Sequence, residues 1–99
     1  MRKHLRLHPA ALAEAEAALR WYLERSQRAA ESFLREISRA VDQIAQTPDR
    51  FPQFEFGTRK ILLRRFPYLL VFRETATAVE IVALAHGRRK PGYWRDRVQ

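Results

Sequence analysis

The sequence contains no cysteine among its 99 residues. This absence excludes disulfide bonds, thiol catalysis and cysteine-ligated zinc sites. Only three histidines are present, His4, His8 and His86, and none of them belongs to a metal-binding motif such as HExxH. We therefore expect neither a metal ion nor any other cofactor.

The chain also lacks a long hydrophobic run. The longest apolar stretch, Phe66–Phe72, has the length of a strand and falls far short of the roughly 18 residues that a membrane-spanning helix needs. The N-terminus begins with basic residues, but charge and polarity continue beyond them, so the apolar middle of a signal peptide is missing. We expect a cytoplasmic protein with no membrane partner, folded as one domain over residues 1–99.

Acidic residues are scarce in the second part of the chain. The net charge is +8, and residues 59–99 carry ten Lys and Arg against three Asp and Glu, whereas residues 1–58 are almost balanced. A local positive surface attracts polyanions or an acidic protein partner. An arginine-rich genome is the alternative explanation, but base composition alone does not explain the asymmetry.

Two long segments have the pattern of amphipathic helices. Residues 10–25 are rich in alanine, the strongest helix former, and residues 27–46 follow Ser26, a suitable N-cap. Because the link between them is short, we expect an antiparallel helical hairpin. The expected apolar stripes are Leu12, Ala15, Leu19, Tyr22 and Leu23 in the first helix and Phe33, Leu34, Ile37, Val41 and Ile44 in the second. A solvated face is expected for Glu14, Glu24, Arg28, Glu31, Arg35 and Arg39.

Short strands flank the two helices. Residues 3–7 alternate polar and apolar side chains, and residues 59–65, 68–73 and 78–85 follow one another closely, which favours an antiparallel meander. The nearly all-apolar segment 78–85 is expected to be central. These elements predict an α+β fold of order β-α-α-β-β-β. The helical hairpin packs on one face of a small antiparallel sheet, and the other face is partly free to carry basic residues.

Aromatic residues mark the loop 48–57 and the tail. We expect Phe51, Phe54 and Phe56 to pack against the core rather than extend into solvent. The tail after the last strand is basic and rich in turn residues, and Trp94 is its expected apolar anchor.

Five segments, in this order, resemble the RelE/ParE toxin superfamily. They are ALRWY at 18–22, FL at 33–34 with VDQI at 41–44 and PDRFP at 48–52, Arg59 with LRRFPY at 63–68, VFR at 71–73, and HGRRKP at 86–91 followed by Trp94. The resemblance covers essentially the whole chain. It implies the toxin of a type II toxin–antitoxin system, in a hetero-oligomer with an antitoxin whose extended or helical segment wraps the toxin.

The superfamily contains two kinds of target. RelE-like members cut mRNA in the ribosomal A site, whereas ParE-like members poison DNA gyrase and have no hydrolytic site. We favour a ParE-like toxin without enzymatic activity over an enzyme, and the question of enzymatic activity stays open. The alternatives are a RelE-like, ribosome-dependent mRNA endonuclease and a non-toxic basic binding module of the same fold.

The choice of target depends on the chemistry available in the basic half. RNA cleavage needs an acid, a base and positive charge at the scissile phosphate. The candidates for these roles are Lys60, Arg64, His86, Arg88 and Tyr93. Because arginine is a poor proton donor, its predominance over lysine disfavours a nuclease. His86 has a structural alternative, in which it forms a hydrogen bond at the strand end and sets the following turn.

Two sets of binding residues are expected. Contact with the target or with nucleic acid is assigned to Arg59, Arg64, Arg65, Arg88 and Arg89, and contact with the antitoxin to Trp21, Tyr22, Arg64, Arg88 and Arg89. Adjacent helical residues diverge by about 100°, so one of Trp21 and Tyr22 is expected in the core and the other beside the antitoxin.

Overall fold

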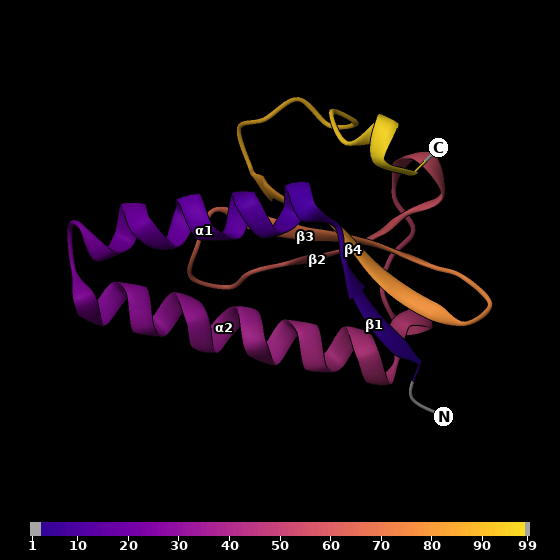
Figure 1. The fold of residues 1–99 in the computed structure, drawn as a ribbon, viewed down its shortest axis with the longest axis horizontal. Coiled ribbons are helices and arrows are strands. Elements are labelled where there is room, and N and C mark those ends of the chain that lie inside the picture. Colours follow the sequence, from indigo (N-terminus) through magenta and orange to yellow (C-terminus); the bar gives the residue numbers. More distant parts are fainter. Residues whose placement is uncertain (1–2, 99) are drawn as a thin grey trace.

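A computed structural model describes residues 3–98 of the chain (Figure 1). The strands are β1 (His4–Leu7), β2 (Arg59–Leu62), β3 (Tyr68–Glu74) and β4 (Ala78–His86), and the helices are α1 (Pro9–Leu23) and α2 (Gln27–Gln46). Short 3-10 turns occupy Pro48–Arg50, Glu55–Gly57 and Arg95–Val98. The predicted α+β class and the order of the elements are confirmed. β2 is shorter than expected because residues 63–67 form the loop that leads into β3.

The strands of residues 3–98 form a sheet in the order β1-β4-β3-β2. β4 is therefore central, as its apolar sequence predicts. β2, β3 and β4 are antiparallel to one another, but β1 is parallel to β4, which corrects the expectation of an entirely antiparallel sheet. The short links around β3 force the chain to reverse, whereas the long connection through both helices places no such constraint on β1.

Both helices begin at residues that satisfy their first backbone N–H groups. The His8 Nδ1 atom accepts from the Ala10 N–H at 3.0 Å, and Pro9 occupies the first turn, where its missing N–H costs nothing. The Ser26 hydroxyl accepts from the Ala29 N–H at 3.1 Å, which confirms the predicted N-cap. The helices lie side by side as an antiparallel hairpin (Figure 1). Within residues 3–98, neither helix is apolar enough over sufficient length to cross a membrane.

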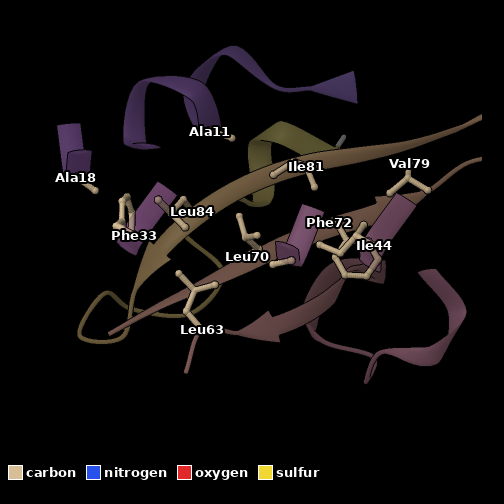
Figure 2. Close-up of a cluster of buried hydrophobic side chains, with 11 residues drawn as sticks. Ala11, Ala18, Phe33, Ile44, Leu63, Leu70, Phe72, Val79, Ile81 and Leu84 are labelled. Atoms are coloured by element: carbon tan, nitrogen blue, oxygen red, sulfur yellow. The ribbon is translucent and has the colours of Figure 1, made fainter. Parts of the chain in front are cut away.

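The main core lies between the helical hairpin and one face of the sheet. Phe33 and Ile44 of α2 are completely buried there, in one cluster with Leu70 and Phe72 of β3 (Figure 2). Burial of such side chains contributes about 1.5–3 kcal/mol each. The orientation of α2 is thus fixed by its large apolar residues.

The packing of α1 depends on small residues instead. Its buried positions are Ala11 and Ala18, which allow the helix to lie close to β4. The expected stripe was wrong at Leu12 and Leu23, which are about half exposed, and Leu34 of α2 is exposed as well. Because a helix turns by about 100° per residue, a stripe centred on Ala11 directs Leu12 outward.

The second face of the sheet was expected to be partly free, but this expectation was wrong, because the tail packs against it. Trp94 is 1% exposed and packs in a cluster with Val71, Val82 and Ala83, so its role as an anchor is confirmed. Ile81 pairs with Phe72 and Ala83 with Val71, which leaves Val82 as the extra residue of a β-bulge.

The three loop phenylalanines differ in their surroundings. Phe51 packs against the main core, and the Phe54 ring lies 5.3 Å from that of Trp94. The expectation for Phe56 was wrong, since this side chain is 48% exposed. Its backbone has a φ of +60°, followed by Gly57 at +73°, and this left-handed turn directs the ring outward.

The two tryptophans provide a test of the tail's contribution to stability. Replacing Trp94 with Ala should lower the free energy of unfolding by about 3–5 kcal/mol, because it opens a cavity under the second face. Trp21→Ala is the control, since the Trp21 side chain is 50% exposed, and its effect should be well below that of Trp94→Ala. Urea unfolding followed by circular dichroism measures both. Similar losses for the two variants would contradict the role of Trp94 as an anchor.

Candidate functional site

Three segments meet at one end of the sheet. The loop 63–67 enters β3, β4 ends at His86, and the last turns of α1 lie beside them. The Gly87 N–H donates to the Pro67 carbonyl oxygen at 2.7 Å, which ties the turn after β4 to the loop before β3. This end therefore gathers Arg64, Arg65, Arg88 and Arg89, four of the five arginines predicted to contact the target or nucleic acid.

An aromatic cluster attaches this end to the helices. The Tyr22 ring lies 5.0 Å from that of Phe33 and 5.1 Å from that of Phe66, which belongs to the loop. Trp21 meets the edge of Tyr22 at 5.0 Å between ring centroids and is half exposed. The expected divergence of Trp21 and Tyr22 is confirmed, with Tyr22 in the core and Trp21 at the surface.

A groove of about 410 Å³ lies beside Trp21. Its helical wall contains Ala17, Ala18 and Trp21, and its other wall contains Tyr68, His86 and Arg89. The helical wall of the groove is thus largely apolar, and the facing wall carries polar and cationic groups. Such a surface suits an amphipathic segment with acidic residues.

Glu14 also lines the groove, and its carboxylate joins three segments. Arg97 donates to both of its oxygens, at 2.9 and 3.1 Å, the Tyr93 hydroxyl donates at 2.7 Å, and the Leu84 backbone N–H donates at 3.1 Å. The Glu14 side chain is only 18% exposed, so the expectation that it lies on a solvated face was wrong. Position 14 is aligned with Ala11 and Ala18 on the buried face of α1, which was an available signal.

Glu14 and Arg97 also complete the edge of β4. β1 ends where the His8 N–H donates to the Ile81 carbonyl oxygen at 2.9 Å. Beyond this point Glu14 accepts from the Leu84 N–H, and Arg97 donates to the Val82 carbonyl oxygen at 3.1 Å. Side chains therefore satisfy backbone groups that β1 is too short to reach.

The hydrogen bonds around Glu14 shift the pKa values of Glu14, Tyr93 and Arg97. Burial tends to raise the pKa of Glu14, but the hydrogen bonds from Arg97, Tyr93 and Leu84 outweigh it and hold the pKa below its ordinary value of 4.5. Burial and the adjacent Glu14 raise the pKa of the Tyr93 phenol well above its usual range. The hydrogen bond to Glu14 raises the pKa of Arg97. At neutral pH the network is an ion pair that binds a neutral tyrosine.

Residues 86–89, which we call the HGRR turn, have side chains in different surroundings. The His86 Nδ1 atom accepts from the Arg88 N–H at 3.0 Å, which agrees with the structural alternative for this histidine. The Arg89 guanidinium stacks on the Tyr93 ring at 3.8 Å and lines the groove, while Arg88 is exposed. Through Tyr93, Glu14 therefore also helps to position Arg89.

Two of the expected site residues lie elsewhere. The Arg59 guanidinium donates to the Phe51 carbonyl oxygen at 2.6 Å, so it holds the loop before β2. Lys60 lies over the Phe54 ring at 4.2 Å, beside the Trp94 cluster and hence on the sheet face opposite the helices. His86 instead contacts Tyr68, whose ring faces Phe33 of α2.

A second hollow, of about 180 Å³, lies between α2 and the loop 63–67. It is lined by Ser32, Arg35, Glu36, Arg39, Arg64 and Arg65. Glu36 accepts hydrogen bonds from the backbone N–H groups of Arg64 and Arg65, the latter at 3.1 Å. Sequence reasoning missed Glu36 because its partners are backbone atoms 28 and 29 residues away.

Comparison with known proteins identifies the fold and the family. A family model described as the ParE toxin of the type II toxin–antitoxin system parDE matches residues 5–91. A chain of a chromosomal ParDE system from P. aeruginosa is 20% identical with a TM-score of 0.75, over 86% of this chain and 96% of that one. A mutant of the E. coli toxin RelE in the free state is 16% identical with a TM-score of 0.62, over 89% and 86%. Among curated proteins there is no match.

The Glu14 network predicts a dependence of stability on pH. Glu14→Gln removes the charge and should lower the free energy of unfolding at pH 7 by about 1.5–3 kcal/mol. Because the pKa of Glu14 is lower in the folded state, the carboxylate stabilises the fold above the unfolded pKa, and this contribution disappears as the pH falls through the folded pKa. The difference between wild type and variant should therefore shrink below pH 4.5.

Urea unfolding at a series of pH values measures this difference. The control is Glu16→Gln, because Glu16 is an exposed carboxylate of the same helix and its replacement should change little. A Glu14→Gln effect that is equal at every pH would show that the packing of the side chain matters, rather than its charge.

Proposed function

The chain belongs to the ParE toxin family of type II toxin–antitoxin systems, and from this membership we propose that it inhibits growth by acting on DNA gyrase and is neutralised by a cognate antitoxin. The family match spans residues 5–91 and thus includes both helices, β2 to β4, all of β1 except His4, and the HGRR turn. In this proposal the toxin acts by protein contact and forms a hetero-oligomer with its antitoxin.

The preference for gyrase over mRNA as the target rests mainly on the hydrogen bond and the protonation state of Tyr93. Its hydroxyl donates a hydrogen bond to Glu14 at 2.7 Å, and its raised pKa makes it a weaker acid than an ordinary tyrosine. A phenol in this state is poorly suited to proton transfer during RNA cleavage. The position of Lys60 on the opposite face of the sheet from His86 supports the same conclusion. Contact with gyrase requires no such acid–base pair.

The groove beside Trp21 is the proposed antitoxin site. A half-exposed tryptophan beside Ala17 and Ala18 is a suitable anchor point, since aromatic residues are enriched among the residues that dominate binding energy. Arg89 on the wall, with Arg88 and Arg64 near the same end, would attract an acidic segment. An antitoxin segment with apolar residues at helical spacing and carboxylates beside them fits both features.

Expression in the absence of an antitoxin distinguishes the targets. We expect growth arrest with filamentation and induction of the DNA-damage response, while pulse-labelled protein synthesis continues. Purified protein should inhibit supercoiling by gyrase. Immediate loss of translation with mRNA cut at codon boundaries would instead indicate the ribosome-dependent nuclease. The double variant Arg88→Ala/Arg89→Ala should weaken inhibition with a normal circular dichroism spectrum, because exposed charges usually change stability by about 0.5 kcal/mol or less.

Binding of the antitoxin provides a separate test of the groove. Trp21→Ala should weaken the complex by about 2 kcal/mol or more, mainly through faster dissociation. In the wild type, higher salt should slow association far more than it accelerates dissociation, because charges at the rim steer the encounter. Surface plasmon resonance at several salt concentrations measures both rates, and Leu12→Ala is the control, since Leu12 is a half-exposed α1 residue that does not line the groove. An unchanged affinity in Trp21→Ala would place the antitoxin elsewhere.

A further inference from the structure

The second hollow brings together four arginines from two distant segments. Arg35 and Arg39 are one turn apart on α2, and Arg64 and Arg65 come from the loop between β2 and β3. All four residues are exposed. Within residues 3–98, their guanidinium groups form no ion pair and no hydrogen bond. We name this group of four the arginine hollow.

The loop arginines are held in position by a contact to their backbone. Glu36 accepts from the N–H groups of both Arg64 and Arg65. The carboxylate is therefore directed at the loop backbone, and the two side chains extend from a fixed base. A fixed loop lowers the entropy lost when a ligand is bound.

The charge of the arginine hollow is unbalanced. Glu36 is the only acidic residue among its lining residues, against four arginines. Like charges one turn apart on a helix, such as Arg35 and Arg39, destabilise it by a few tenths of a kcal/mol. An anion that bridges the guanidinium groups would remove this repulsion, and arginine binds phosphate and carboxylate in the same bidentate manner.

The composition of the lining distinguishes between these two anions. No apolar side chain lines the arginine hollow itself, whose remaining member is Ser32. The apolar residues Ile61, Leu62 and Leu63 line an adjoining hollow that shares its edge. Protein interfaces depend on apolar and aromatic residues at their centre, and the groove beside Trp21 has these. Contacts to a phosphodiester backbone come instead from arginine and lysine with hydroxyl side chains, and they need no apolar anchor.

We propose that the arginine hollow binds the phosphodiester backbone of duplex DNA. The choice of DNA over other nucleic acids rests on the proposed function, because gyrase acts on duplex DNA and a toxin bound to it meets that duplex. Contacts to the backbone carry no sequence information, so binding should be independent of sequence. The groove and the arginine hollow share no lining residue, although Arg64 of the hollow also lies near the groove end to which we assign the antitoxin.

Fluorescence anisotropy with two 20-base-pair duplexes of unrelated sequence tests the proposal on the full chain. Each phosphate contact contributes about 0.9 to the slope of log K against log salt. The slope is negative, and Arg35→Ala/Arg39→Ala should therefore reduce its magnitude by about two for both duplexes. Both positions are exposed on a helix and alanine is the strongest helix former, so the fold should persist. The control Arg6→Ala/Arg20→Ala removes the same charge from exposed positions outside the arginine hollow and should leave the slope unchanged.

Several results would overturn the proposal. They are equal losses in both double variants, which would indicate a general effect of net charge, absence of duplex binding at 50 mM salt, and binding of a poly-glutamate peptide in place of DNA. Stronger binding of an RNA duplex would overturn the choice of DNA. A gyrase supercoiling assay separates this proposal from the proposed function. Duplex binding through these arginines without inhibition of gyrase would refute only the target, and full inhibition without duplex binding would refute only the arginine hollow.

Discussion

The structure around the groove depends on the hydrogen bonds that the Glu14 carboxylate accepts. It accepts from Arg97, from Tyr93 and from the backbone of β4, and so connects α1, the central strand and the tail. Charged hydrogen bonds in a half-buried position are stronger than neutral ones, and the loss of one partner leaves the others unsatisfied. Because Arg89 stacks on Tyr93, the position of a groove residue follows from a carboxylate on the inner side of a helix.

Glu36 has a similar role on the other side of the loop 63–67, where it holds the backbone of Arg64 and Arg65. Further acidic residues are also engaged in structure, since Glu80 pairs with Arg73 across two strands and Glu74 pairs with Lys3. In a chain of net charge +8, these carboxylates fix elements in place, and the basic residues they do not engage remain directed outward. The cationic surface therefore results from how the few acidic residues are used as well as from the number of arginines.

Much of the fold follows from local signals in the sequence. The central position of β4, the N-cap at Ser26 and the anchoring by Trp94 each depend on residue type and periodicity, which are visible along the chain. The predicted antiparallel direction of β1 was wrong because a long connection places no local constraint on this strand.

The candidate site was predictable in part, for similar reasons. Arg64, Arg65, Arg88 and Arg89 were predicted as binding residues because charge is read directly from the sequence, whereas Arg35 and Arg39 were expected only on a solvated face. Glu36 was missed because it binds backbone atoms, which no side-chain pattern reveals. Glu14 could have been found, since a carboxylate aligned with Ala11 and Ala18 must have a partner when that face is buried.

The loop 63–67 explains how so small a fold can offer two different surfaces. On one side, Phe66 packs against Tyr22 and Phe33, and Pro67 and Tyr68 line the groove opposite its apolar helical wall. On the other side, Arg64 and Arg65 face α2 across a hollow without apolar lining. A basic pair followed by apolar residues within one short segment thus separates a surface suited to an amphipathic protein segment from one suited to phosphate. Because Glu36 and the Gly87 contact to Pro67 fix the same loop, a ligand that displaced the loop from one side would alter the other surface as well.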